Sequence, residues 1–156
     1  MGNPPFSKVI NNKVLLEKYK DEKFNKNTNN IFSFFIEKAC SISKYVSLII
    51  PKSLINSPEF NKTRELLVDY NIYSLTDYGE KAFNGVKIET ISFLLNTSKK
   101  EKQSNIRIES YISNDVIIQD KDYIFSKDFP YWLIYRNSFF DSVVEKMELD
   151  IFESLR

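Results

Sequence analysis

The chain contains no histidine, a single cysteine and only three glycines among its 156 residues. Histidine is the commonest general base and the commonest metal ligand, so its absence argues against Ser-His-Asp, Cys-His and zinc chemistry. We expect no metal site. Cys40 has no partner for an internal disulfide, which fits a reducing compartment. Gly2, Gly79 and Gly85 are too far apart in the sequence to form a Gly-rich loop of the kind that binds phosphates or nucleotides.

The sequence also lacks an excess of one charge and a long apolar run. Its 22 Lys and Arg residues against 21 Asp and Glu residues leave a net charge of +1, so any contact with a polyanion has to be local. Without a run of about 18 apolar residues or a charged-then-apolar leader, we expect a cytoplasmic protein with no membrane association. The 42% hydrophobic and 15% aromatic content predicts a folded core.

Helical and extended patterns alternate in the first two thirds of the chain. Thr28 to Asn30 are capping residues for a helix, and the spacing of the apolar residues that follow predicts its buried face. That face consists of Ile31, Phe34, Phe35, Ala39 and Ile42. We expect a strand buried on both faces at 45–50, a helix from Ser57 to about Tyr70, and strands at 72–77 and 86–95. This order is half of a doubly wound α/β sheet, with the last two strands as an antiparallel pair at the sheet edge.

The composition of the sequence changes near residue 100, which predicts a boundary between two units of the chain. The chain becomes polar at 99–103 and then resumes with apolar segments at 106–112 and 116–118, an aromatic cluster, and an amphipathic helix at 137–152. We predict one unit at 1–100 and a C-terminal α+β extension at 101–156. The extension is either the start of a second domain or an arm packed on the first. The charged segment 12–26 is interpreted as a surface segment with a solvated face.

The tetrapeptide Asn3-Pro4-Pro5-Phe6 has the chemistry of a binding site. Two prolines with locked φ angles hold the Asn3 amide oxygen and the Pro4 carbonyl close together, as a pair of acceptors for a planar amine with two N–H groups. Phe6 offers a ring face on which a heterocyclic base can stack, worth about 1 to 3 kcal/mol. The alternative for four residues is an ordinary Pro-rich turn.

Several ordered strings together resemble a family, the adenine-specific DNA methyltransferases of type II restriction-modification systems, and within it the gamma class. They are Asn-Pro-Pro-Phe at 3–6, Asn-Ile-Phe-Ser-Phe-Phe-Ile-Glu-Lys-Ala at 30–39, Val-Ser-Leu-Ile-Ile-Pro-Lys-Ser at 46–53 and Tyr-Gly-Glu-Lys-Ala-Phe at 78–83. The resemblance covers residues 3 to about 97. It implies the second half of a Rossmann-like, S-adenosylmethionine-dependent methyltransferase fold with an antiparallel edge strand.

The resemblance also implies roles for individual residues. Asn3 and the Pro4 carbonyl accept the two hydrogens of the adenine amine, and S-adenosyl-L-methionine is the methyl donor. The base has to leave the duplex, so the partner is double-stranded DNA with a flipped adenine. The implied site residues are Asn3, Pro4, Pro5 and Phe6 as catalytic, Phe6 and Phe83 as substrate-binding, and Ile31 and Phe35 as cofactor-binding. For Phe83, Ile31 and Phe35 core packing is the alternative.

The family's Gly-rich cofactor turn has no equivalent in this sequence. We therefore expect a fragment that cannot methylate alone and that needs a missing N-terminal half or a partner subunit, with an associated restriction endonuclease as a further partner. Two other functions stay open. The same pocket serves enzymes that methylate a protein glutamine or a ribosomal RNA guanine, and the chain could be a non-catalytic remnant that binds DNA or a subunit.

Overall fold

A computed structural model describes residues 1–9, 12–21, 24–98, 104–126 and 129–146. Helical segments alternate with strands up to residue 79, and in the described residues three further strands and two short helices follow. The helices are α1 (Lys13–Asp21), α2 (Ile31–Ile42), α3 (Ser53–Asn56), the 3-10 turn η1 (Pro58–Phe60), α4 (Asn61–Val68), α5 (Lys121–Ile124) and α6 (Ser138–Lys146). The strands are β1 (Tyr45–Pro51), β2 (Asn71–Gly79), β3 (Thr90–Asn96), β4 (Asn105–Ser110) and β5 (Asp115–Asp120).

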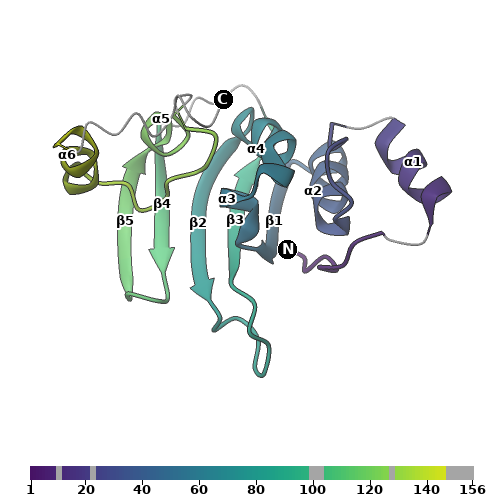
Figure 1. The fold of residues 1–156 in the computed structure, drawn as a ribbon, viewed down its shortest axis with the longest axis horizontal. Helices are drawn as coiled ribbons and strands as arrows, with labels where there is room; N and C mark the ends of the chain where they lie inside the picture. Colours follow the sequence, from purple (N-terminus) through teal and green to yellow (C-terminus); the bar gives the residue numbers. More distant parts are fainter. Residues whose placement is uncertain (10–11, 22–23, 99–103, 127–128, 147–156) are drawn as a thin grey trace.

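Within the described residues these strands form one sheet in the order β1-β3-β2-β4-β5 (Figure 1). β3 is antiparallel to both β1 and β2, β4 is parallel to β2, and β5 is antiparallel to β4. β1, β2 and β4 therefore run in one direction. Their carboxyl ends lie together at one end of the sheet, the carboxyl edge. The long loop between β2 and β3 projects from this edge, and the N-terminus lies near it (Figure 1).

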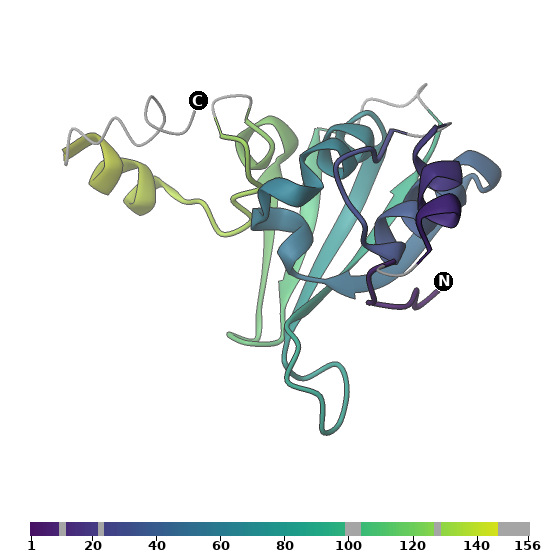
Figure 2. The same cartoon turned by 45° about the vertical axis from the view of Figure 1, so that its right-hand side comes forward.

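One face of the sheet carries the hydrophobic core, which α3 and α4 cover (Figure 2). Alternate residues of β1 point into it, because side chains of a strand alternate between faces. Val46, Leu48 and Ile50 are buried, whereas Tyr45 is 58% exposed. The prediction that β1 is buried on both faces is therefore wrong. The described residues leave its second face partly open.

The buried face of α2 agrees only in part with the predicted one, because Phe34 is buried and Ala39 packs against the core as expected. Phe32, Ile36 and Cys40 belong to the core, whereas Phe35 is 50% and Ile42 68% exposed. The helix has apolar residues on nearly every side, so a helical period fits more than one stripe. Packing against β1 and α4 selects the stripe that is buried.

The antiparallel pair of β2 and β3 is confirmed, but it is not at the sheet edge. β3 lies between β1 and β2, and β4 pairs with the other edge of β2. β3 also begins at Thr90 and not at residue 86. Val86 and Ile88 are 43% and 41% exposed and belong to the loop.

The segment after residue 103 shares the sheet and the core of the first part. Ile106, Ile108 and Ile124 are fully buried in the same cluster as Phe32 and Leu75. The part of the predicted helix 137–152 beyond Lys146 lies outside the described residues. The boundary near residue 100 stays a prediction. Among the described helices, none is long and apolar enough to cross a membrane.

Candidate functional site

The first residues of the chain lie beside β1. The Gly2 N–H donates to the Ser47 carbonyl at 2.9 Å, and the Ile49 N–H donates to the Gly2 carbonyl at 3.0 Å. Gly2 thus forms a parallel bridge with Leu48. A Cβ atom at Gly2 would lie 3.0 Å from the Leu48 side chain, so this approach favours glycine. The bridge directs the next residues toward the carboxyl ends of β1, β2 and β4, where open α/β sheets bind ligands.

Asn3, Pro4, Pro5 and Phe6 line a pocket of about 770 Å³ at this edge. The opposite wall comes from the loop between β2 and β3 and consists of Ala82, Phe83, Asn84 and Val86. Asn3 is exposed, so its amide group is accessible, whereas Pro4 is buried and fixes the main chain. The structure therefore brings the predicted tetrapeptide and Phe83 together in one pocket, although they are far apart in the sequence.

Two aromatic rings of the pocket lining contact each other edge to face. The ring centroids of Phe6 and Phe83 lie 6.2 Å apart with an angle of 70° between the ring planes, an edge-to-face contact. A planar group that stacks on Phe6 would thus meet the Phe83 ring at a steep angle. Phe6 is half-buried, so part of its ring is available for such a stack.

The segment that follows the tetrapeptide is fixed to the start of α2. The Ile31 N–H donates to the Ser7 carbonyl at 2.9 Å, and the Val9 N–H donates to the Asn29 carbonyl at 2.9 Å. Glu59 supports this junction, because its carboxylate accepts from Thr28 at 3.0 Å and from Asn30 at 2.8 Å. Sequence reasoning missed Glu59, since an acidic residue in a first helical turn is explained by the helix dipole.

Ile31 and Phe35 lie on α2 outside the pocket. Ile31 is half-buried and adjoins the tetrapeptide through its N–H bond to Ser7, but its side chain is not part of the pocket wall. Phe35 is 50% exposed, so its ring is not core packing. Packing therefore leaves the Phe35 ring available for another contact.

A buried carboxylate, that of Asp77, lies near the end of β2, just before the loop at 80–89 that carries one wall of the pocket. Asp77 has no exposed side-chain surface, and its Oδ2 is 2.7 Å from Lys52 Nζ. The Tyr135 hydroxyl donates to the same oxygen at 2.7 Å, and the Gly79 N–H donates to Oδ1 at 3.0 Å. Burial by itself raises the pKa of Asp77, but the hydrogen bonds from Lys52, Tyr135 and Gly79 outweigh it and lower the pKa. Burial and the bond to Asp77 raise the pKa of Tyr135 to about 12.

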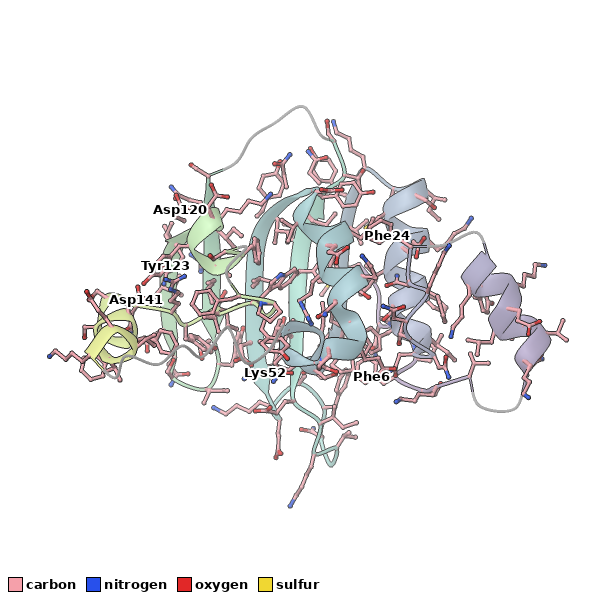
Figure 3. All side chains as sticks on the ribbon, turned by 45° about the horizontal axis from the view of Figure 1, so that its top comes forward. Phe6, Phe24, Lys52, Asp120, Tyr123 and Asp141 are labelled. Carbon is pink, nitrogen blue, oxygen red and sulfur yellow. The ribbon has the colours of Figure 1, made fainter. Side chains whose placement is uncertain are left out.

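Lys52 pairs with this carboxylate from the residue that directly follows β1. Figure 3 shows Lys52 and Phe6 toward the edge from which the loop between β2 and β3 projects. The sequence reasoning did not single out Asp77 or Tyr135. The available signal was the lysine that directly follows β1, together with an aspartate near the carboxyl end of β2, the strand that comes next in the sequence and runs in the same direction.

The fold is that of S-adenosylmethionine-dependent methyltransferases, as comparison with solved structures shows. A protein described as a class I S-adenosylmethionine-dependent methyltransferase of Listeria monocytogenes matches with a TM-score of 0.54 and 15% identity, over 69% of this chain and 34% of that one. Residues 1–83 match the model of the Eco57I restriction-modification methylase family, which is more than half of the chain. The chain belongs to this family.

Two further structures come from restriction-modification systems. A modification subunit assigned to a type I restriction enzyme of Vibrio vulnificus YJ016 has a TM-score of 0.56 and 14% identity, over 69% of this chain and 24% of that one. A chain from a type I restriction-modification system has a TM-score of 0.59 and 12% identity, over 98% of this chain and 43% of that one. This chain therefore spans less than half the length of these structures. No curated protein sequence matches it significantly.

Proposed function

We propose that this chain is part of a site-specific DNA methyltransferase of the gamma class. The reaction transfers a methyl group from S-adenosylmethionine to the exocyclic amine of a flipped-out adenine in a restriction-modification system. S-adenosylhomocysteine is the leaving group, and one amine proton passes to solvent. The observation that carries the proposal is the pocket itself. Asn3, Pro4 and Phe6 face Phe83 at the carboxyl ends of the parallel strands, in a chain of a restriction-modification methylase family.

The chemistry of the pocket fits an amine with two hydrogens. The Asn3 amide oxygen accepts one N–H and the Pro4 carbonyl accepts the other, which draws the nitrogen lone pair out of conjugation with the ring. Phe6 stacks on the base and Phe83 closes the pocket from the other side. When bound, S-adenosylmethionine supplies an electrophilic methyl group, and the transfer needs alignment of the amine more than a strong base. A chain without histidine meets this requirement.

Ile31 and Phe35 are the residues we propose for contact with the cofactor. The Phe35 ring is half exposed on α2, and Ile31 lies next to the segment that leads out of the tetrapeptide. An apolar ring at this position suits one face of an adenosyl group. A Phe35→Ala variant should weaken the affinity of the competent enzyme for the cofactor, measured by calorimetry, and should leave the affinity for DNA unchanged.

The remaining cofactor contacts, in this proposal, come from an N-terminal half or a partner subunit that pairs with the free edge of β1. In the described residues β1 pairs with β3 on one side and, on the other, with Gly2 alone. A parallel strand that ends at Gly2 would complete this edge. The isolated chain should then bind S-adenosylmethionine too weakly for calorimetry, and micromolar affinity would contradict this part of the proposal.

Replacement of Asn3 by alanine tests the reaction. In the protein that methylates, Asn3→Ala should lower the rate constant for methyl transfer to duplex DNA by about a hundredfold or more, because one of the two acceptors for the amine is lost. The exposed Asn27 offers a matched control, and Asn27→Ala should leave the rate unchanged. The product should be N6-methyladenine, identified by mass spectrometry of digested DNA.

Other outcomes would favour other functions. Methyl transfer to a release factor or to ribosomal RNA, with none to DNA, would replace adenine by a glutamine amide or a guanine amine as the substrate. If Asn3→Ala leaves the biological activity of the whole assembly unchanged, the chain is a DNA- or subunit-binding module and the catalytic proposal fails. We further propose that the segment 101–156 leads to a target-recognition region and that a restriction endonuclease acts on the same DNA sequence.

A further inference from the structure

The loop at 80–89 carries one wall of the pocket, and both of its ends are tied to Lys52. At the end of the loop, the Lys52 N–H donates to the Glu89 carbonyl at 2.9 Å, and Lys52 Nζ lies 3.7 Å from Glu89 Oε1. In β2, shortly before the loop begins, Lys52 Nζ lies 2.7 Å from Asp77 Oδ2. The lysine side chain is only 17% exposed, so water weakens this ion pair little.

Asp77 sets the direction in which the loop leaves β2. Its Oδ1 accepts from the Gly79 N–H at 3.0 Å, and Gly79 has a φ of +55° next to a register shift between β2 and β3. The Asp77 carbonyl accepts from the Tyr111 N–H at 2.8 Å, and the Lys81 ammonium donates to the Tyr111 carbonyl at 2.6 Å. The base of the loop is therefore fixed to the ends of both β2 and β4.

Tyr135 brings the C-terminal segment to this point. Its ring is 42% exposed, but its hydroxyl reaches the fully buried Asp77 carboxylate at 2.7 Å. The next residue, Arg136, is paired with Asp141 of α6 at 2.7 Å and lies over the rings of Tyr123 and Phe129. A displacement of the segment that leads to α6 would thus act on the Asp77 carboxylate through one hydroxyl group.

We propose that Tyr135, Asp77 and Lys52 are positioning residues for the methyl transfer described above, on which this inference rests. They hold the loop at 80–89 so that Phe83 closes the pocket over a base stacked on Phe6. Because Tyr135 belongs to the C-terminal segment, the same three residues transmit the position of that segment to Phe83. Contact of the C-terminal part with DNA would then adjust the pocket wall.

The first test reads the position of the loop and needs no enzymatic activity. A Phe83→Trp reporter is combined with Tyr135→Phe, which removes only the hydroxyl, or with Tyr131→Phe as a control. Tyr131 lies on the same segment but packs over Arg64. We expect Tyr135→Phe to raise the acrylamide quenching constant of the reporter about twofold, with no change for Tyr131→Phe. Equal quenching in the two variants would overturn the proposal.

The second test is a double-mutant cycle that measures methyl transfer by the protein that methylates DNA. Tyr135→Phe should lower kcat about tenfold, with the KM for DNA within twofold, because a hydrogen bond to a buried charge is lost. In a Phe83→Ala background the same substitution should lower kcat less than twofold, since Tyr135 acts through the loop. Equal losses in both backgrounds would show an independent, structural role for Tyr135 and would overturn the inference.

The two tests separate this inference from the proposed function. If the unaltered protein fails to methylate adenine, the proposed function fails, and the quenching measurement still decides whether Tyr135 holds the loop. If methylation occurs and depends on Asn3 but neither readout responds to Tyr135→Phe, only the positioning role fails.

Discussion

Buried polar residues stabilise the part of this molecule that carries the proposed substrate pocket. Asp77 is the central case, because one carboxylate accepts hydrogen bonds from a lysine, a tyrosine and a main-chain N–H. A buried charge of this kind is stable only while its partners remain, and the loss of one partner leaves the desolvation cost uncompensated. Substitutions around Asp77 should therefore affect both stability and the pocket.

The lowered pKa of Asp77 makes a prediction for stability against pH. Burial opposes ionisation, but the bonds from Lys52, Tyr135 and Gly79 prevail, so the pKa is lower in the folded than in the unfolded chain. The ionised carboxylate contributes its full stability above the unfolded pKa of about 3.9. This contribution is lost as the pH falls through the folded pKa.

Asp77→Asn should consequently lower the free energy of unfolding at pH 7 by about 3 kcal/mol, the range for breaking a buried ion pair. The gap between the two proteins should narrow below about pH 4, because the unfolded chain takes up a proton on Asp77 there whereas the folded chain does so only at lower pH. Urea denaturation between pH 3 and pH 7 measures both quantities. A gap that stays constant with pH would show that the charge of Asp77 contributes nothing.

At the scale of the element, a glycine ends β2. Gly79 has a φ of +55°, and a Cβ atom there would lie 2.9 Å from Cγ1 of Ile112. Gly85, in the middle of the pocket loop, has a φ of +77° with nothing within 4 Å of such a Cβ atom. The two glycines share the left-handed conformation and differ in packing, so they form a matched pair.

Gly79→Ala should lower the free energy of unfolding by about 2 to 3 kcal/mol, because strain from the positive φ adds to the clash with Ile112. Gly85→Ala should cost about 1 kcal/mol, from backbone strain alone. Thermal unfolding followed by circular dichroism measures the two changes. Equal costs would mean that Ile112 moves aside without penalty.

Across the whole molecule, one core joins the sequence before and after residue 100. Trp132 is 5% exposed in that core and packs on Phe125, and its main-chain N–H donates to the Ile55 carbonyl at 3.0 Å. The Arg64 guanidinium donates to the Leu54 carbonyl at 2.6 Å and to the Pro130 carbonyl at 3.1 Å. These contacts connect α3 and α4 to the C-terminal segment.

We therefore expect a single cooperative unfolding transition. The fluorescence of Trp132, the only tryptophan, should change at the same urea concentration as the far-ultraviolet circular dichroism of the whole chain. Two separate midpoints would instead support an independent unit at 101–156. The Arg64→Met variant should shift both signals together, because the contacts of Arg64 bridge the two parts.

The sequence by itself determined the order of the strands and one wall of the pocket, the tetrapeptide at 3–6. The α/β class, β1, the antiparallel pairing of β2 with β3 and the change of character near residue 100 are all visible as local patterns. Asn3, Pro4, Pro5 and Phe6 carry their chemistry within four consecutive residues, where locked backbone angles suffice to predict two converging acceptors. Local patterns of this kind do not depend on the rest of the chain.

Only the tertiary structure decided which surfaces meet. The buried stripe of α2 and the internal place of β3 depend on neighbours that are distant in sequence, since an all-round apolar helix and a short connection each allow several arrangements. Asp77, Lys52 and Tyr135 come from three separate segments, and no single pattern links them. Their hydrogen bonds form because the ends of β1 and β2 share one edge of the sheet and the C-terminal segment returns to cover it.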